Sequence, residues 1–262
     1  MRWTDEYKNK QIGKESINYQ GDKMIIVEYV DSSNIVIEFQ DEYRTRIKTR
    51  KGRFDSGDVK NPYHPTLYGV GIVGNKYPAS VNGKDAKEYK AWSHILERCF
   101  SEKYKNKQPT YKDVIVCKEW LLYENFYEWI HSQSNFVAWY NGVRWGLDKD
   151  ILVKGSKIYS PETCCLVPQN VNNLFTKNNV IRNSTPIGVH EQLGKYLALC
   201  NNPFTKEQEY LGSYNTPEDA FYKYKPHKES YIKQVAQEEY SKGNITKQCY
   251  EAMMNYEVEI TD

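Results

Sequence analysis

Positively charged side chains recur at every second position in one short segment near the N-terminus. They are Arg44, Arg46, Lys48 and Arg50, and Lys51 and Arg53 extend the series. Because successive side chains of a β-strand point to opposite faces, this period places the cations in a row along one face. Such a row suits a phosphate backbone, so we predict nucleic-acid contacts at these six residues. A charged edge strand that blocks aggregation is the alternative interpretation.

Two carboxylates that stand one residue apart form a second group with possible chemistry. Asp148 and Asp150 flank Lys149, and a loop that carries Lys154 and Lys157 follows. Carboxylate oxygens are preferred ligands of Mg²⁺ and Mn²⁺, so the pair is a candidate metal site. A turn in which the carboxylates accept backbone N–H bonds is the alternative. The two lysines of the loop are predicted to contact nucleic acid.

Histidine and cysteine chemistry has no recognisable pattern in this chain. The five histidines are isolated from one another, and the six cysteines form no CxxC pair and no zinc-finger spacing. We therefore expect reduced, mostly buried thiols. No apolar run is long enough to cross a bilayer, and the N-terminus is polar, which together predict a cytoplasmic protein without a membrane partner.

These residues must be positioned by a fold of the α+β class. Alternating apolar residues and turn signals predict a small N-terminal β meander or barrel over residues 1–75, with the cationic row in a third strand over residues 43–50. Residues 84–180 are predicted to form a ββα module with flanking helices. Its first helix carries a stripe formed by Trp92, Ile95, Leu96 and Cys99.

The predicted ββα hairpin consists of one strand at residues 147–151, a second strand at 158–164 and a helix that begins near Pro168. The next module, residues 181–241, is predicted as a three-stranded sheet followed by a helix. Pro226 should end or kink that helix, with a second helix after it. A helical tail over residues 242–262 completes the chain.

Charge is distributed unevenly along the chain, although the net charge is only +2. Residues 181–262 contain 9 Lys and Arg against 12 Asp and Glu, a net −3, so the excess of positive charge lies in the first two thirds. The 23 tyrosines suit base stacking and protein interfaces equally.

A resemblance to a known DNA-binding domain follows from motifs in the last third. Residues 188–189, 194–198, 210–214 and 216–220 are similar, in order, to the APETALA/ethylene-response-factor domain, which also occurs in phage homing endonucleases. The resemblance implies a sheet that enters the major groove. The matching positions are His190, Gln192, Lys195, Tyr196 and Asn201, where the arginines usual in that family are absent.

A second resemblance covers residues 92 to about 175. The segments 92–99, 114–120, 147–150 and 159–164 look like HNH-type endonuclease-like proteins of bacteriophages. The resemblance implies one divalent cation, Mg²⁺ or Mn²⁺, with Asp148 as the first ligand and Asn172 as the ligand returned by the helix. It places Lys149 where active members carry the histidine that acts as general base.

Three functions remain open on this basis. The first is a phage DNA-binding protein of homing-endonuclease ancestry that contacts double-stranded DNA. The second is a phage counter-defence inhibitor that binds a host protein complex. The third is a metal-dependent DNA endonuclease. All three predict action in the cytoplasm of an infected bacterial cell.

Overall fold

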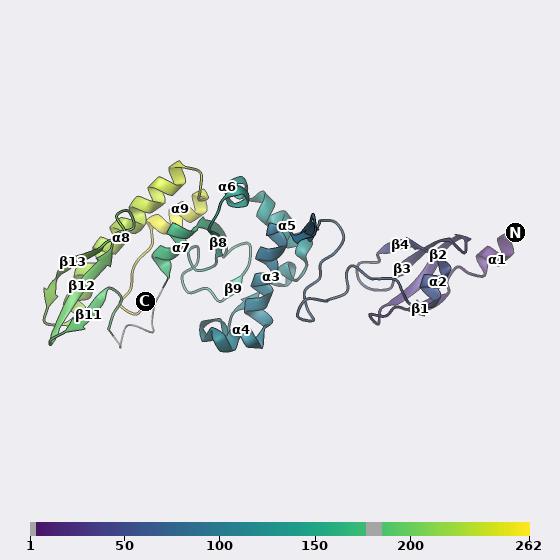
Figure 1. Cartoon of the computed structure of the whole chain (residues 1–262), viewed down its shortest axis with the longest axis horizontal. Helices are drawn as coiled ribbons and strands as arrows, with labels where there is room; N and C mark the ends of the chain where they lie inside the picture. Colours follow the sequence, from purple (N-terminus) through teal and green to yellow (C-terminus); the bar gives the residue numbers. More distant parts are fainter. Residues whose placement is uncertain (1–3, 177–184) are drawn as a thin grey trace. The chain divides into compact units, whose positions relative to one another are not determined.

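The computed structural model describes residues 4–176 and 185–262 (Figure 1). The chain divides into two compact units. One comprises Met1–Lys107 and Lys118–Tyr127, and the other comprises Gln108–Cys117 and Glu128–Asp262. Helices and several small sheets alternate along the sequence, which confirms the predicted α+β class.

An open antiparallel meander forms the first sheet. Its strands, in spatial order, are β1 (Glu15–Ile17), β2 (Lys23–Asp31), β3 (Asn34–Phe39) and β4 (Arg46–Thr49). The alternating residues Ile35, Ile37 and Phe39 are buried, and Phe54 from the short helix α2 (Lys51–Asp55) packs against them. A short helix, α1 (Asp5–Asn9), precedes the sheet. The outer strands β1 and β4 do not pair, so the described strands form a meander and not a barrel.

Aromatic side chains form the core of the rest of this unit. The helices are α3 (Lys87–Phe100), α4 (Glu102–Lys107), a 3₁₀ turn (Lys118–Leu121) and the start of α5 (Tyr123–Ser132), beside a small hairpin of β5 (Ser80–Val81) and β6 (Lys84–Asp85). The predicted stripe of α3 is confirmed, because all four of its residues are buried. The indole Nε1 of Trp92 donates to the carbonyl of Trp120 at 2.7 Å.

A buried carboxylate organises a loop in the same unit. Glu124 accepts the backbone N–H groups of Asn75 and Lys76, both at 2.8 Å, and the hydroxyl of Tyr63 at 3.1 Å. Gly74 lies so close that a Cβ added there would be 2.2 Å from the carboxylate. The three hydrogen bonds explain how a charged side chain tolerates burial at this position.

The predicted hairpin of the second unit exists, but with a different second strand. The strand β8 (Trp145–Asp148) pairs antiparallel with β10 (Cys165–Pro168), and α7 (Gln169–Phe175) begins directly after Pro168. The segment predicted as the second strand contributes only β9 (Ile158–Tyr159), which pairs in parallel with β7 (Ile115–Val116). The prediction that residues 158–164 pair with 147–151 is therefore wrong. A 3₁₀ turn (Pro109–Tyr111) and α6 (Phe136–Asn141) complete this part.

A three-stranded antiparallel sheet follows, in the order β11 (Val189–Gln192), β12 (Lys195–Asn201) and β13 (Gln208–Tyr214). One face packs against the long helix α8 (Pro217–Ser241), whose N-cap Thr216 accepts the N–H of Asp219. This sheet, α8, the ββα hairpin and α9 (Lys247–Met254) share one hydrophobic core.

Pro226 does not end the helix, so the predicted separate second helix is wrong. The single helix α8 includes Pro226 in its interior. Tyr224 on one side of the proline and Ile232 on the other are buried in the same core. Burial of both halves offsets the hydrogen bond that proline cannot donate.

The six cysteines are free thiols, and five of them are buried, as predicted. Among residues 4–176 and 185–262, no helix combines the length and the apolar character needed to cross a membrane.

Candidate functional site

The cationic row is shorter and more curved than the sequence predicts. Only Arg46 and Lys48 lie within β4, where their side chains are exposed while Ile47 and Thr49 point inward. Arg44 has a positive φ of 49° and belongs to the turn before the strand. Arg50 caps α2, and the remaining two cations lie inside that helix. The predicted regular strand over residues 43–50 is therefore wrong at both ends.

Most of these cations also face carboxylates of the same unit. Glu38 on the neighbouring strand forms ion pairs with Arg46 at 2.9 Å and with Arg44 at 3.7 Å. Lys51 pairs with Asp55 at 2.6 Å and Arg53 pairs with Asp58 at 3.0 Å. Only Lys48 and Arg50 of the six have no ion pair with any described residue. The row is therefore largely neutralised, and β4 resembles the charged edge strand of the alternative interpretation.

The carboxylate of Asp148 shapes the turn that follows β8. Its Oδ1 accepts the backbone N–H groups of Asp150 at 2.7 Å and of Ile151 at 3.0 Å. Burial raises the pKa of the Asp148 carboxyl above its usual range, although both hydrogen bonds favour the charged form. These contacts are those of a turn stabilised by its own aspartate.

Lys149 fills the position beside the second carboxylate. Its Nζ donates to both oxygens of Asp150, at 2.9 and 2.8 Å, and to the carbonyl of Ser156 at 2.6 Å. The residue is only 9% exposed. All three donor positions of the ammonium are thus directed at protein oxygens, an arrangement suited to a structural role and not to accepting a proton.

The predicted metal ligands do not fit a divalent cation in this arrangement. The Lys149 ammonium occupies the position in front of the Asp150 oxygens, and Asp148 is directed at backbone amides. Asn172 lies half-buried on α7. Within the described parts of the chain, no group of three or more His, Cys, Asp or Glu side chains could hold a metal ion.

The two loop lysines differ in their surroundings. Both are exposed, but Lys154 is also engaged by the C-terminal segment. Its Nζ donates to the carbonyl of Glu257 at 2.9 Å and to Asp262 at 2.8 Å, and it lies 5.1 Å from the centre of the Tyr256 ring. Lys154 is therefore partly covered by an acidic segment of the same unit.

The open face of the C-terminal sheet is the surface least crowded by internal contacts. Strand register assigns His190, Gln192 and Lys195 to this face, opposite the helix α8. Tyr196 is different, because it packs on the helix side against the core, away from the face on which a DNA contact is expected. The alternation of Tyr196 with the buried Ala198 and Cys200 is the signal that identifies its face.

The open face also includes the matched residue Asn201, and strand register adds residues to it that motif matching missed. Leu197 pairs with Ser213, Leu199 with Tyr210, and Asn201 with Gln208. Tyr210 is 61% exposed. None of the described strand residues on this face is acidic: they are His190, Gln192, Lys195, Leu197, Leu199, Asn201, Gln208, Tyr210 and Ser213. The two acids of these strands, Glu191 and Glu209, pair with Tyr196 and Cys200 on the opposite face.

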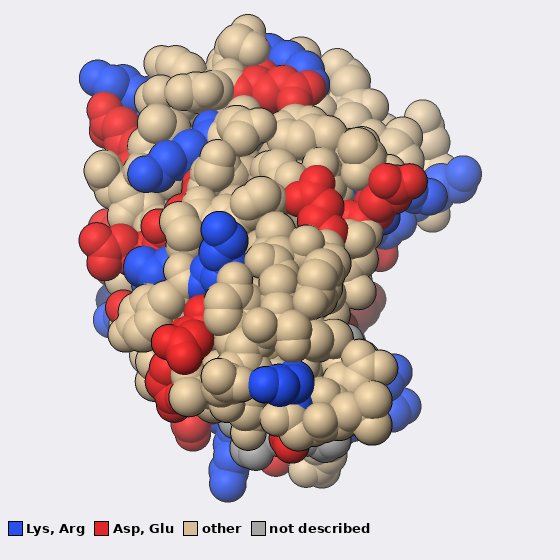
Figure 2. Space-filling view, turned by 90° about the vertical axis from the view of Figure 1, so that its left-hand side faces the viewer, with Lys and Arg blue, Asp and Glu red and all other residues tan. Residues whose placement is uncertain are grey.

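Figure 2 views the molecule from the side on which β11–β13 lie in Figure 1. Positive and negative side chains are interspersed there, with broad areas of uncharged surface between them. The view shows no continuous basic patch.

Behind the sheet, Glu209 is the centre of a polar cluster. Its carboxylate accepts the hydroxyl of Tyr231 at 2.6 Å, the amide of Asn202 at 2.8 Å and the Nε2 of His227 at 2.8 Å. These hydrogen bonds, that from Tyr231 above all, lower the pKa of Glu209 to about 2. The same contact raises the pKa of Tyr231 to about 12. The cluster attaches the β12–β13 turn to α8 and removes a carboxylate from the open face.

Comparisons with protein-family models, curated proteins and solved structures find no match. The functional argument therefore depends on the geometry of the chain itself.

Proposed function

We propose that this chain is a phage-encoded DNA-binding protein of homing-endonuclease ancestry that contacts a DNA groove with the open face of β11–β13. The observation that carries the proposal is the segregation of charge in this sheet. Residues 181–262 have a net charge of −3, yet no carboxylate lies among the described strand residues of the open face. A surface that approaches phosphates closely must exclude carboxylates, because like charges repel.

The chemistry of the open face suits the edges of base pairs. Gln192, Asn201 and Gln208 present amide groups, which pair with the N6 and N7 positions of adenine. Leu197 and Leu199 are partly exposed and suit thymine methyl groups. Strands about 4.8 Å apart give three strands a width of about 10 Å, which suits a major groove about 12 Å wide. The arrangement supports recognition of A·T-containing sites in the cytoplasm of an infected cell.

The proposal is tested by placing carboxylates on the open face. Asn201→Asp with Gln208→Glu adds two negative charges with almost no change in shape. We expect this variant to lose at least about tenfold in affinity for duplex DNA at 50 mM salt, the loss expected from one impaired base contact.

The matched control adds the same charges elsewhere. Gln234→Glu with Gln237→Glu places them on the exposed surface of α8, and we expect affinity within about twofold of the unmodified chain. Equal affinities for the sheet variant and the control would remove the proposal, as would the absence of any retention on DNA at low salt.

One observation favours a second candidate function, the binding of a host protein such as a defence complex. Leu193 is 98% exposed at the β11–β12 turn, where it also adopts a positive φ of 52°. An exposed leucine in a backbone conformation unfavourable to it is typical of contact residues. We expect Leu193→Ser to abolish capture of a specific protein from nuclease-treated lysate and to leave DNA retention unchanged, because serine adds no charge beside the open face. Capture that survives this substitution would exclude the second function at this site.

A further inference from the structure

The C-terminal segment that covers Lys154 has the composition of a polyanion. Residues 255–262 contain three acids, Glu257, Glu259 and Asp262, and no cation. Lys154 forms ion pairs with Asp262 at 2.8 Å and with Glu259 at 3.6 Å. Its Nζ also donates to the backbone carbonyl of Glu257, so one lysine contacts this segment at three places.

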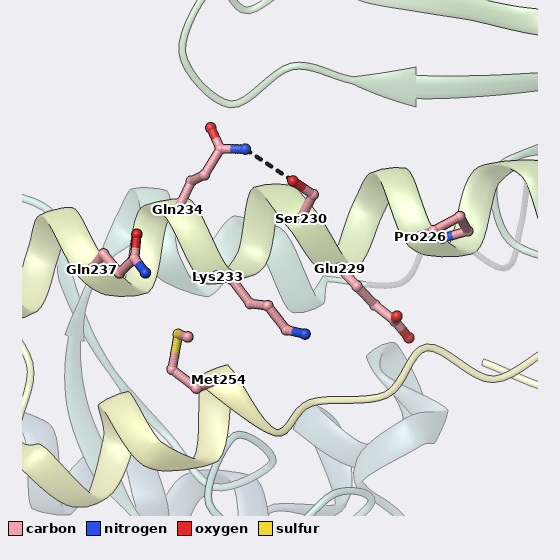
Figure 3. Close-up of a pocket in the computed structure, with 7 residues that line it drawn as sticks. All are labelled: Pro226, Glu229, Ser230, Lys233, Gln234, Gln237 and Met254. Carbon is pink, nitrogen blue, oxygen red and sulfur yellow. Dashed lines mark hydrogen bonds between the residues drawn. The ribbon is translucent and has the colours of Figure 1, made fainter.

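A second lysine contacts the same segment from α8. The Nζ of Lys225 donates to the carbonyl of Val258 at 2.7 Å. Glu229, one turn further along the helix, accepts the backbone N–H of Val258 at 2.8 Å. Figure 3 shows Glu229 directed from α8 toward the C-terminal segment. Val258 itself is buried in the shared core, which holds the segment in place.

The covered surface belongs to the hairpin loop that sequence analysis predicts to contact nucleic acid. Lys154 and Lys157 are separated by two residues in that loop, and Lys157 is exposed. Lys154 and Lys225 each retain 29% of their side-chain exposure beneath the segment. Carbonyl and carboxylate oxygens of the segment thus take the positions that phosphate oxygens would take on the same ammonium groups.

We infer that Lys154 and Lys225 form a second binding surface for the DNA backbone, and that residues 255–262 occupy it as an internal competitor. Phosphates and the acidic segment use the same two cations, so they exclude each other. The occupant in the absence of DNA is the chain's own segment 255–262, and the exchange partner is a DNA phosphate backbone. This inference rests on the proposed function, because it assigns a second contact to the same ligand.

The test neutralises the competitor without changing its shape. Glu259→Gln with Asp262→Asn removes the two carboxylates that pair with Lys154, and the thermal midpoint checks that folding is preserved. We expect about tenfold tighter binding to a 20-base-pair duplex at 100 mM salt. The slope of log affinity against log salt should steepen by about 2, since each new phosphate contact contributes about 0.9. Adding Lys154→Gln to this variant should abolish the gain.

The control neutralises two exposed glutamates elsewhere in the same unit, Glu238→Gln with Glu251→Gln, and should leave affinity and salt slope unchanged. A second readout is hydrogen exchange at the backbone amide of Val258, which the duplex should accelerate in the unmodified chain as the segment leaves. An equal gain in the control, a gain that persists with Lys154→Gln, or an unchanged affinity of the neutralised variant would each overturn the inference.

Failure of the proposed function is recognised separately. If neutralisation strengthens binding but Asn201→Asp with Gln208→Glu has no effect, the lysine surface stands and the sheet proposal falls. If the sheet variant weakens binding but neutralisation has no effect, the reverse holds. If no variant retains DNA, both are wrong.

Discussion

The pair Lys149–Asp150 should respond unequally to removal of either partner. The Lys149 side chain is 11% exposed, whereas that of Asp150 is 45% exposed. Lys149→Met leaves the Asp150 carboxylate, which water can solvate. The main loss of stability then comes from the Ser156 carbonyl, which loses its hydrogen-bond donor. Asp150→Asn leaves a buried ammonium without its hydrogen-bonded counter-charge. We therefore expect Asp150→Asn to be the more damaging substitution.

The expected losses follow from these two situations. A buried charge without its partner costs about 3 kcal/mol at the lower end of measured values, and a buried acceptor without its donor costs about 1.5 kcal/mol. The double variant should resemble Lys149→Met, because no unpaired ammonium remains. Because the two units need not unfold together, the free energy of local opening is best measured by hydrogen exchange at the amides of β8 and β10.

The exposed Lys157 supplies the control, and Lys157→Met should change the local stability by less than about 0.5 kcal/mol. A larger loss for Lys149→Met than for Asp150→Asn would refute the reasoning, since it would mean that the carboxylate and not the ammonium is the group that water cannot reach.

Three further predictions concern other parts of the chain. Glu124→Gln should accelerate hydrogen exchange at the Asn75 and Lys76 amides and lower the free energy of unfolding by about 2 kcal/mol. The control Glu119→Gln changes an exposed side chain and should do neither. Equal exchange rates in both variants would contradict the described contacts. The lowered pKa of Glu209 means that its contribution to the free energy of unfolding is complete above pH 4.5 and is lost as the pH falls toward 2. Glu209→Gln should therefore lower stability at pH 7 and reduce the dependence of stability on acid pH, as measured by urea unfolding. Gly188→Ala should destabilise the C-terminal sheet by more than about 2 kcal/mol, because the new Cβ would lie 2.2 Å from the Tyr224 ring. The Cβ of Gly194→Ala meets nothing within 4 Å, so this variant should cost only about 1 kcal/mol of backbone strain. Thermal unfolding measures both losses.

Local patterns in the sequence predict much of this fold. Alternation identifies the strands that contain Ile35, Ile37 and Phe39, and helical spacing identifies the stripe around Trp92. Thr216 and Pro217 are typical of a helix start, and α8 begins there. These features depend on neighbours within a few residues, so a single sequence contains the information they need.

Features that depend on distant partners could not be predicted in this way. The acids that neutralise the cationic row include Glu38 on the neighbouring strand, which only the β3–β4 register brings beside Arg46. The segment at 158–159 pairs with residues 115–116. Pairing across such a separation leaves no local pattern in the sequence, so it could not be predicted. The outward residues Tyr210 and Gln208 likewise become part of the candidate surface only through their pairing with β12.

The parallel pairing of β7 with β9 also constrains how the chain can be made and divided. Residues 108–117 belong to the second unit, but the ribosome produces them before residues 118–127 of the first. At a synthesis rate of about 5–20 residues per second, β7 waits about 2–9 s for its partner β9 to emerge. A single cut in the gene between residues 127 and 128 would leave residues 108–117 on the fragment that encodes the first unit. A shortened version of the second unit must therefore include residues 108–117.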